Sequence, residues 1–150
     1  MVTAINGSTF QQDMILFWRD ILRSNITDPL GRNGSEFVYS SYPQKNVKYP
    51  IITVKSAPAS PAQRLGMRSE AYALNLPIEV RVWARKESEK DQLFQEIHYF
   101  VQTNQFGTGS VFENVELHDT KMLSAVDVDE AGEENVKSKV IQFNQFFIST

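Results

Sequence analysis

The feature that most constrains the fold is a strict alternation of apolar and polar side chains over residues 71–84. Successive side chains of a β-strand point to opposite faces, so this pattern predicts a long strand with one buried face. Pro77 lies inside the run and cannot donate a backbone hydrogen bond, which predicts a bulge or an edge position there. The apolar face consists of Tyr72, Leu74, Leu76, Ile78, Val80 and Val82, and the opposite face includes Asn75, Glu79, Arg81 and Trp83.

Two further segments have apolar residues at helical spacing. The first helix is predicted to follow Ser8, which has the form of a capping box together with Gln11. The second is predicted to follow Ser88, a typical N-cap residue. Stripes of this kind are typical of packing against a core. The stripes contain Phe10, Met14, Phe17, Trp18, Ile21 and Leu22 in the first helix, and Leu93, Phe94, Ile97, Phe100 and Val101 in the second.

Shorter β-rich runs complete the predicted order of elements. Residues 37–40 and 51–54 precede the long strand. Residues 111–117, 122–128 and 136–148 follow the second helix and are predicted to form two or three antiparallel strands. Residues 56–70 show neither period, and we expect a long mobile arm there. The order predicts a single α+β domain over residues 1–150, with a mostly antiparallel sheet and both helices packed on one face.

Composition excludes several classes of protein. The chain has no cysteine, which excludes disulfide scaffolds, thiolate metal sites and thiol nucleophiles and favours an intracellular origin. Fifteen basic against eighteen acidic residues argue against a strongly basic nucleic-acid module. No segment approaches the roughly 18 apolar residues of a membrane span, and the N-terminus lacks a signal-peptide pattern. We therefore expect a soluble protein with no membrane partner.

No group of residues predicts an enzyme or a metal site. The two histidines have no metal-binding partners at a recognisable spacing. A run starting at Asp127 begins like a calcium loop, but Ala131 and Ser138 stand where carboxylates are needed. Metal-dependent hydrolysis through Glu79, Asp127 and Asp129 is the least favoured alternative. We expect no catalytic residue, no metal and no cofactor.

Charge is distributed unevenly along the chain. Residues 127–134 carry five acidic side chains and no basic one, whereas residues 55–86 hold six basic and two acidic side chains. Ordinary surface variation is one explanation. The alternative is that the acidic segment of one copy contacts the basic segment of another. The residues expected at a subunit or partner interface are Arg64, Met67, Arg68, Arg81, Trp83, Arg85, Asp127, Asp129, Glu130, Glu133 and Glu134.

Trp83 raises a similar question, because the alternation places it on the face opposite the aliphatic row. It lies close in sequence to Arg81 and Arg85. Loops of the same chain would cover it in one interpretation. In the other it is an aromatic interface anchor beside arginines.

Three segments in this order resemble one protein family. Tyr49 and Pro50 open the strand at residues 51–54, the long strand ends in a Val-Arg-Val-Trp sequence at Trp83, and a charged helix start follows at Glu89. Together with the N-terminal helix and the arm, this succession is similar to that of the tail-terminator and tail-completion proteins of long-tailed phages and related viruses. The resemblance covers most of the chain.

The resemblance implies a structural role in the virion. Such proteins form closed rings, usually six-fold, that cap the tail tube and join it to the head. The implied partners are further copies of the chain, the tail tube protein, a neck or connector protein, and genomic DNA passing through the ring without sequence-specific binding. The implied location is the tail or neck of the virion, after assembly in the host cytoplasm.

Two alternatives to the tail terminator remain open. A head-side neck or connector component belongs to the same class of virion proteins. A monomeric ligand-binding or regulatory module that uses the sheet face around Trp83 belongs to another class.

Overall fold

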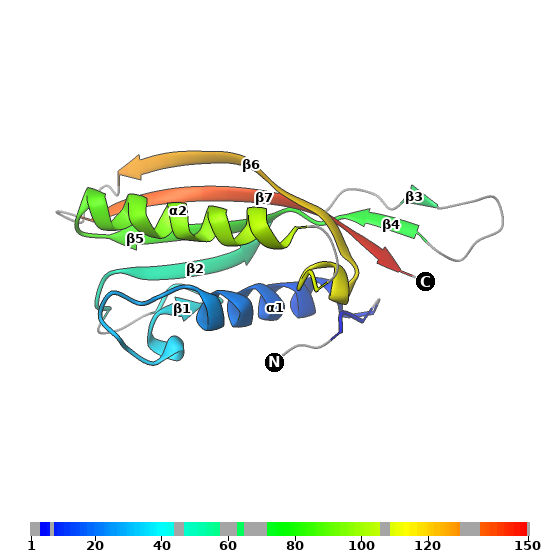
Figure 1. Ribbon diagram of the computed structural model, residues 1–150, viewed down its shortest axis with the longest axis horizontal. Coiled ribbons are helices and arrows are strands. Elements are labelled where there is room, and N and C mark those ends of the chain that lie inside the picture. The colour runs from blue at the N-terminus through cyan, green and yellow to red at the C-terminus, as the bar shows by residue number, and fades with distance from the viewer. Residues whose placement is uncertain are drawn as a thin grey trace.

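The computed structural model describes residues 4–6, 8–43, 47–57, 63–64, 72–105, 109–129 and 136–149. In this part of the chain, seven strands form one sheet with the order β1-β2-β5-β7-β4-β3, and β6 pairs with the other side of β7. All pairs are antiparallel except β1 with β2. The two helices pack on one face (Figure 1). The predicted α+β class and the mostly antiparallel sheet are confirmed.

Helix α1 spans Phe10–Asn25 and buries the predicted stripe of apolar residues. Its start differs from the expected capping box, because Thr9 and not Ser8 is the N-cap residue and its side chain makes no capping hydrogen bond. The Asp13 carboxylate instead accepts hydrogen bonds from the Thr9 hydroxyl at 2.8 Å and from the backbone N–H of Asn6 at 3.0 Å. Gln11 donates its side-chain amide to the Ser56 hydroxyl. The capping prediction was therefore wrong in its residues, although the helix begins within two residues of the expected place.

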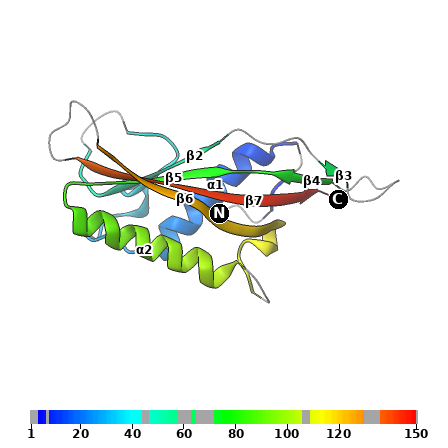
Figure 2. The same ribbon diagram turned by 90° about the horizontal axis from the view of Figure 1, so that it is seen from above.

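Helix α2 spans Glu87–Asn104, and its N-cap is Lys86, not Ser88 as predicted. Its first turn contains Glu87 and Glu89, whose negative charges are favourable next to the exposed amides of a helix N-terminus. Its buried side chains are Lys90, Leu93, Ile97 and Val101. The helix lies along one side of the long strands (Figure 2).

The long alternating run forms two collinear strands, β4 (Tyr72–Asn75) and β5 (Ile78–Ala84). Both pair with β7 (Lys137–Ser149), and the Leu76 amide between them still donates to the Gln145 carbonyl at 2.8 Å. The interruption falls at Pro77, where the sequence predicts one. The face assignment is also confirmed, since Ile78, Val80 and Val82 are fully buried.

The remaining strands are β1 (Val38–Tyr39), β2 (Ile51–Ser56), β3 (Gln63–Arg64) and β6 (Leu117–Asp129). Most of the arm predicted at residues 56–70 lies outside the described residues. Within it, β3 pairs with β4, which the composition of the segment does not indicate. Beside β6, residues 113–115 form a short 3-10 helix, η2 (Glu113–Val115), after a similar turn η1 (Gly34–Glu36) earlier in the chain.

Of the two or three antiparallel strands predicted for the last third of the chain, the structure has two, β6 and β7, and residues 111–116 form a turn. Phe112 and Val115 are buried, so the run of apolar side chains meets the core through a turn and not through a pleated strand. The Leu117 amide donates to the Phe112 carbonyl, which closes this turn just before β6 begins.

The core lies between the helices and the sheet and is centred on Trp18 of α1. Its ring contacts Phe112 and Phe143 at centroid distances of 5.2 and 5.1 Å, and its indole N–H donates to the Gln145 side chain at 3.2 Å. Aromatic pairs at this spacing add to the stabilisation that their buried area supplies. In the described residues, no helix is both long enough and apolar enough to cross a bilayer.

Candidate subunit interface

The sheet face opposite the helices carries the Trp83 side chain, as the alternation predicts. Trp83 is half-buried, because the Tyr42 ring packs against it at a centroid distance of 5.0 Å. The guanidinium of Arg81 lies 4.1 Å from the Trp83 ring centroid, a cation–π arrangement, and the indole N–H donates to the Thr53 hydroxyl at 3.1 Å. Tyr42 of the same chain therefore covers part of Trp83, and a role of the remaining exposed part at an interface stays a prediction.

Arg81 and Arg85 differ in burial and in how strongly neighbouring side chains restrain them. Burial lowers the pKa of Arg81, which also donates to the Ser138 hydroxyl at 3.0 Å. Arg85 is exposed, and its guanidinium lies 5.1 Å from the Tyr49 ring centroid. Arg81 is therefore part of the packed sheet surface, and Arg85 is accessible at its margin.

Asp127 lies on the helix side of β6 and pairs with lysines of its own chain. Its carboxylate is 2.8 Å from the Lys90 ammonium and 3.6 Å from that of Lys139. Lys90 is only 2% exposed, while Asp127 is 59% exposed. Glu87 and Asp91 are the other described carboxylates near Lys90, at 3.5 and 4.0 Å. This cluster joins the first turn of α2 to β6 and β7.

The pKa values in this cluster reflect the pairing. Burial acts to lower the pKa of Lys90, but the hydrogen bond to Asp127 and the surrounding carboxylates raise it above its ordinary value. The hydrogen bond from Lys90 lowers the pKa of Asp127, and the charge of Lys139 adds to this effect, against a smaller opposing effect of burial. The pair therefore stays ionised throughout the neutral range.

The other predicted interface residues are placed only in part. Arg64 belongs to β3, and Asp129 ends β6 with its backbone paired to Lys137. Strand β3 and the end of β6 lie at opposite ends of the molecule (Figure 1). The described candidates therefore do not form one patch on a single copy. Met67, Arg68, Glu130, Glu133 and Glu134 lie outside the described residues.

The carboxylates considered for metal binding do not converge. Glu79 lies on the open face, where its carboxylate is 3.4 Å from the Lys55 ammonium, while Asp127 lies on the helix side. Among the residues that the structure describes, no group of three or more histidine, cysteine, aspartate or glutamate side chains could hold a metal ion.

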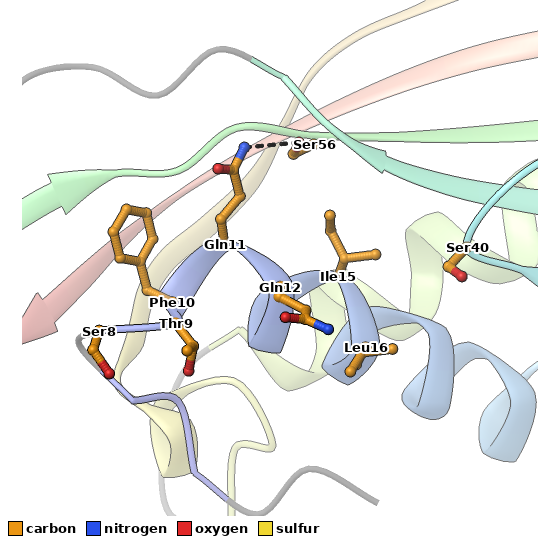
Figure 3. Close-up of a pocket in the computed structure, with 9 residues that line it drawn as sticks. All are labelled: Ser8, Thr9, Phe10, Gln11, Gln12, Ile15, Leu16, Ser40 and Ser56. Carbon is orange, nitrogen blue, oxygen red and sulfur yellow. Dashed lines mark hydrogen bonds between the residues drawn. The ribbon is translucent and has the colours of Figure 1, made fainter.

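A groove of about 640 Å³ lies between the start of α1 and the end of β2 (Figure 3). Gln11 and Ile15 point toward β2 across it, and Ser56 lies at its rim, hydrogen-bonded to Gln11. A smaller hollow of about 160 Å³ lies on the open face beside Lys55, Arg81 and Trp83. Neither hollow could be predicted from the sequence, because each is lined by segments far apart in the chain. The role of Lys90 could not be predicted either, because its partner Asp127 is distant in the sequence.

Comparison with protein-family models finds no matching family, and comparison with curated proteins finds no similar sequence.

Proposed function

We propose that the protein is a virion structural protein that assembles into a ring, acting as a tail terminator or tail-completion protein. Copies of the chain close around a central hole, cap the tail tube and join it to the head, and DNA passes through the hole without sequence-specific contacts. The observation that carries the proposal is the resemblance in element order described above. The α+β fold with two helices on one sheet face is compatible with it.

Two structural features support assembly into copies. The sheet extends past both helices at one end, where β3, β4 and the end of β7 lie beyond the two-layer body (Figure 1). Leu74 and Phe147 in this extension are still buried in the subunit's own core, but no helix covers its outer end, which is available to a neighbour. Large apolar side chains are also exposed along β6, where Leu123 and Val126 are 53% and 55% exposed. A contact of this margin with another copy would remove these two side chains from water.

The test is assembly of the purified protein, alone and with the tail tube protein encoded in the same genome. We expect a single oligomeric mass by native mass spectrometry at tens of micromolar, and ring-shaped particles in electron micrographs. With tube protein, the rings should cap tube ends. A strict monomer that also fails to assemble on added tubes would overturn the proposal. Density in an intact particle would distinguish a tail-side ring from a head-side neck component.

A further inference from the structure

A cluster of aromatic and arginine side chains lies on the open face, at the margin of the sheet that β1 and β2 form. Tyr42 is 40% exposed and packs edge-on against Trp83. The Tyr42 hydroxyl is hydrogen-bonded to that of Tyr49, and the Arg85 guanidinium lies against the Tyr49 ring. Tryptophan, tyrosine and arginine are enriched among the residues that dominate binding at protein interfaces. These four residues, the aromatic cluster, therefore have the composition of a contact surface.

Arg85 supplies the accessible positive charge of the aromatic cluster. It is exposed, and no described carboxylate lies within ion-pair distance of it. The two other cations nearby are already engaged, because Lys55 pairs with Glu79 and Arg81 is stacked on Trp83. A partner that fits this margin therefore presents an apolar side chain to the aromatic rings and a negative charge beside it.

The other margin of the sheet, formed by β6, carries both features (Figure 1). Val126 is 55% exposed. It pairs with Val140, which pairs in turn with Arg81, so Val126 lies on the open face. Val128 has the same orientation, two residues further along the strand. Three glutamates follow in the connection between β6 and β7, at positions 130, 133 and 134. Apolar side chains and negative charge are therefore neighbours on this margin.

The strand registers place the features of the two margins at matching heights. Residues that pair across neighbouring strands form rows, and each row has one height along the strand direction. Val128 lies in the same row as Trp83, with β7 between them. The next row contains Asp129 and Ala84, so Arg85 and the start of the glutamate connection lie one row further. Apolar groups are thus level with the aromatic rings, and acidic groups with the arginine.

We propose that the β6 margin of one copy packs against the aromatic cluster of the next copy, resting on the ring assembly proposed above. Val126 and Val128 contact the Tyr42 ring, and the glutamates of the connection pair with Arg85. Copies stand side by side with their strands along the ring axis, and rotation about that axis keeps each row at its height. Each copy then uses two different surfaces, as a closed ring requires.

This contact leaves the ion pairs within each copy intact. The Asp127 carboxylate lies on the helix side, 2.8 Å from the Lys90 ammonium, and takes no part in the contact. Contact through side chains on the open face also needs no backbone pairing between copies, so β1 keeps its place beside β2.

The first test exchanges charges between the two margins. Arg85→Glu should raise the dissociation constant for self-association at least about 10-fold, because both margins are then acidic. A variant in which the three glutamates of the connection become arginine should be weakened as strongly, because both of its margins are basic. An equimolar mixture of the two variants should associate again, since every contact between unlike copies joins opposite charges. A contact of the connection with Arg85 of its own copy cannot produce this recovery.

The matched control is Lys121→Glu, which changes the net charge as Arg85→Glu does. Lys121 is half exposed and lies near the start of β6, away from the glutamate connection. Its substitution should change the dissociation constant less than about 3-fold. A mixture of the two charge variants that associates no better than either variant alone would overturn the proposal.

The second test concerns the apolar part of the contact. Val126→Ser should raise the dissociation constant at least about 5-fold, because less apolar surface is removed from water. Tyr99→Ser is the control, since Tyr99 is 68% exposed on α2, and it should change the constant less than about 2-fold. Self-association that neither Val126→Ser nor Arg85→Glu weakens overturns this inference and leaves the ring proposal standing. A wild-type chain that stays monomeric overturns both.

Discussion

Lys90 shows how a single residue can connect elements that the sequence separates. Its ammonium is almost fully buried at the start of α2 and bonds the carboxylate of Asp127, thirty-seven positions further along the chain. Removing one partner of a buried ion pair costs more than the pair contributes, because the other charge stays desolvated. At this site Glu87 and Asp91 remain near Lys90, and Asp127 is exposed, so the cost is smaller than in a fully buried pair.

Asp127→Asn should lower the free energy of unfolding by about 1–2 kcal/mol at pH 7. The pKa of Asp127 is lowered in the folded protein, so its contribution is complete above the pKa of the unfolded chain and is lost as pH falls through the folded value. The difference from wild type should therefore shrink between about pH 5 and pH 2. Urea denaturation over this pH range measures it.

Asp119→Asn is the matched control, since Asp119 also lies on β6 but forms only a surface pair with Lys121. Its effect should stay below about 0.5 kcal/mol at every pH. An Asp127→Asn difference that does not change with pH would contradict the assigned ion pair.

A second prediction concerns the buried hydrogen bond between Trp18 and Gln145. Trp18→Phe removes the indole donor. The side-chain oxygen of the fully buried Gln145 then keeps the Thr120 hydroxyl, at 3.4 Å, as its remaining described donor. In a Gln145→Leu background there is no buried acceptor to lose its donor. Trp18→Phe should therefore lower the free energy of unfolding by about 1 kcal/mol less there than in the wild-type background. Denaturation of the four members of this double-mutant cycle measures the coupling. If the two substitutions changed the free energy of unfolding additively, the hydrogen bond would contribute nothing to stability.

At the scale of elements, the long alternating run was the most predictable part of the chain. Its period of two places every second residue from Leu74 to Val82 on the buried face, whichever position the strand takes in the sheet. Pro77 marks where the strand is interrupted. Helix ends were less predictable. Several polar side chains near residue 10 can cap a helix, and the folded chain decides between them, so Asp13 rather than Ser8 organises the start of α1.

The start of α1 therefore makes a distinct prediction. Asp13→Ala removes the acceptor for the Thr9 hydroxyl and the Asn6 amide, and should lower the free energy of unfolding by about 0.5–1 kcal/mol. Ser8→Ala removes a hydroxyl that donates only to the Asn6 side chain, and should have almost no effect. Chemical denaturation of both variants measures this. A larger effect of Ser8→Ala would restore the capping box that the sequence suggests.

At the scale of the whole molecule, the two margins of the sheet are unlike each other. One is covered in part by β1, whose Val38 carbonyl is occupied by Arg23, and the other is the outer edge of β6, with which no described strand pairs. Unlike margins suit a head-to-tail contact, in which each copy contributes a different edge to each neighbour. A contact between the acidic residues 127–134 of one copy and the basic residues 55–86 of another, which the charge distribution suggests, would be sensitive to salt.

We expect self-association to weaken by about 10-fold or more when the salt concentration rises from about 0.05 to 0.5 M, because exposed charges are then screened. Sedimentation velocity at a series of protein concentrations measures this. The free energy of unfolding of the monomer, measured at the same salt concentrations, is the control for a general effect on stability. Association that strengthens with salt would indicate an apolar contact in place of the proposed charged one.

The sequence by itself determined the α+β class, the buried face of the long strand and the two helical stripes, because periodicity records which side chains leave water. Only the tertiary structure decided that Lys90 and Asp127 pair, that Tyr42 packs on Trp83, and that hollows lie on both faces of the sheet beside the end of β2. Each of these depends on segments that meet through the order of strands in the sheet. Local pattern carries no information about that order, because the free energy that selects it comes from contacts between distant residues.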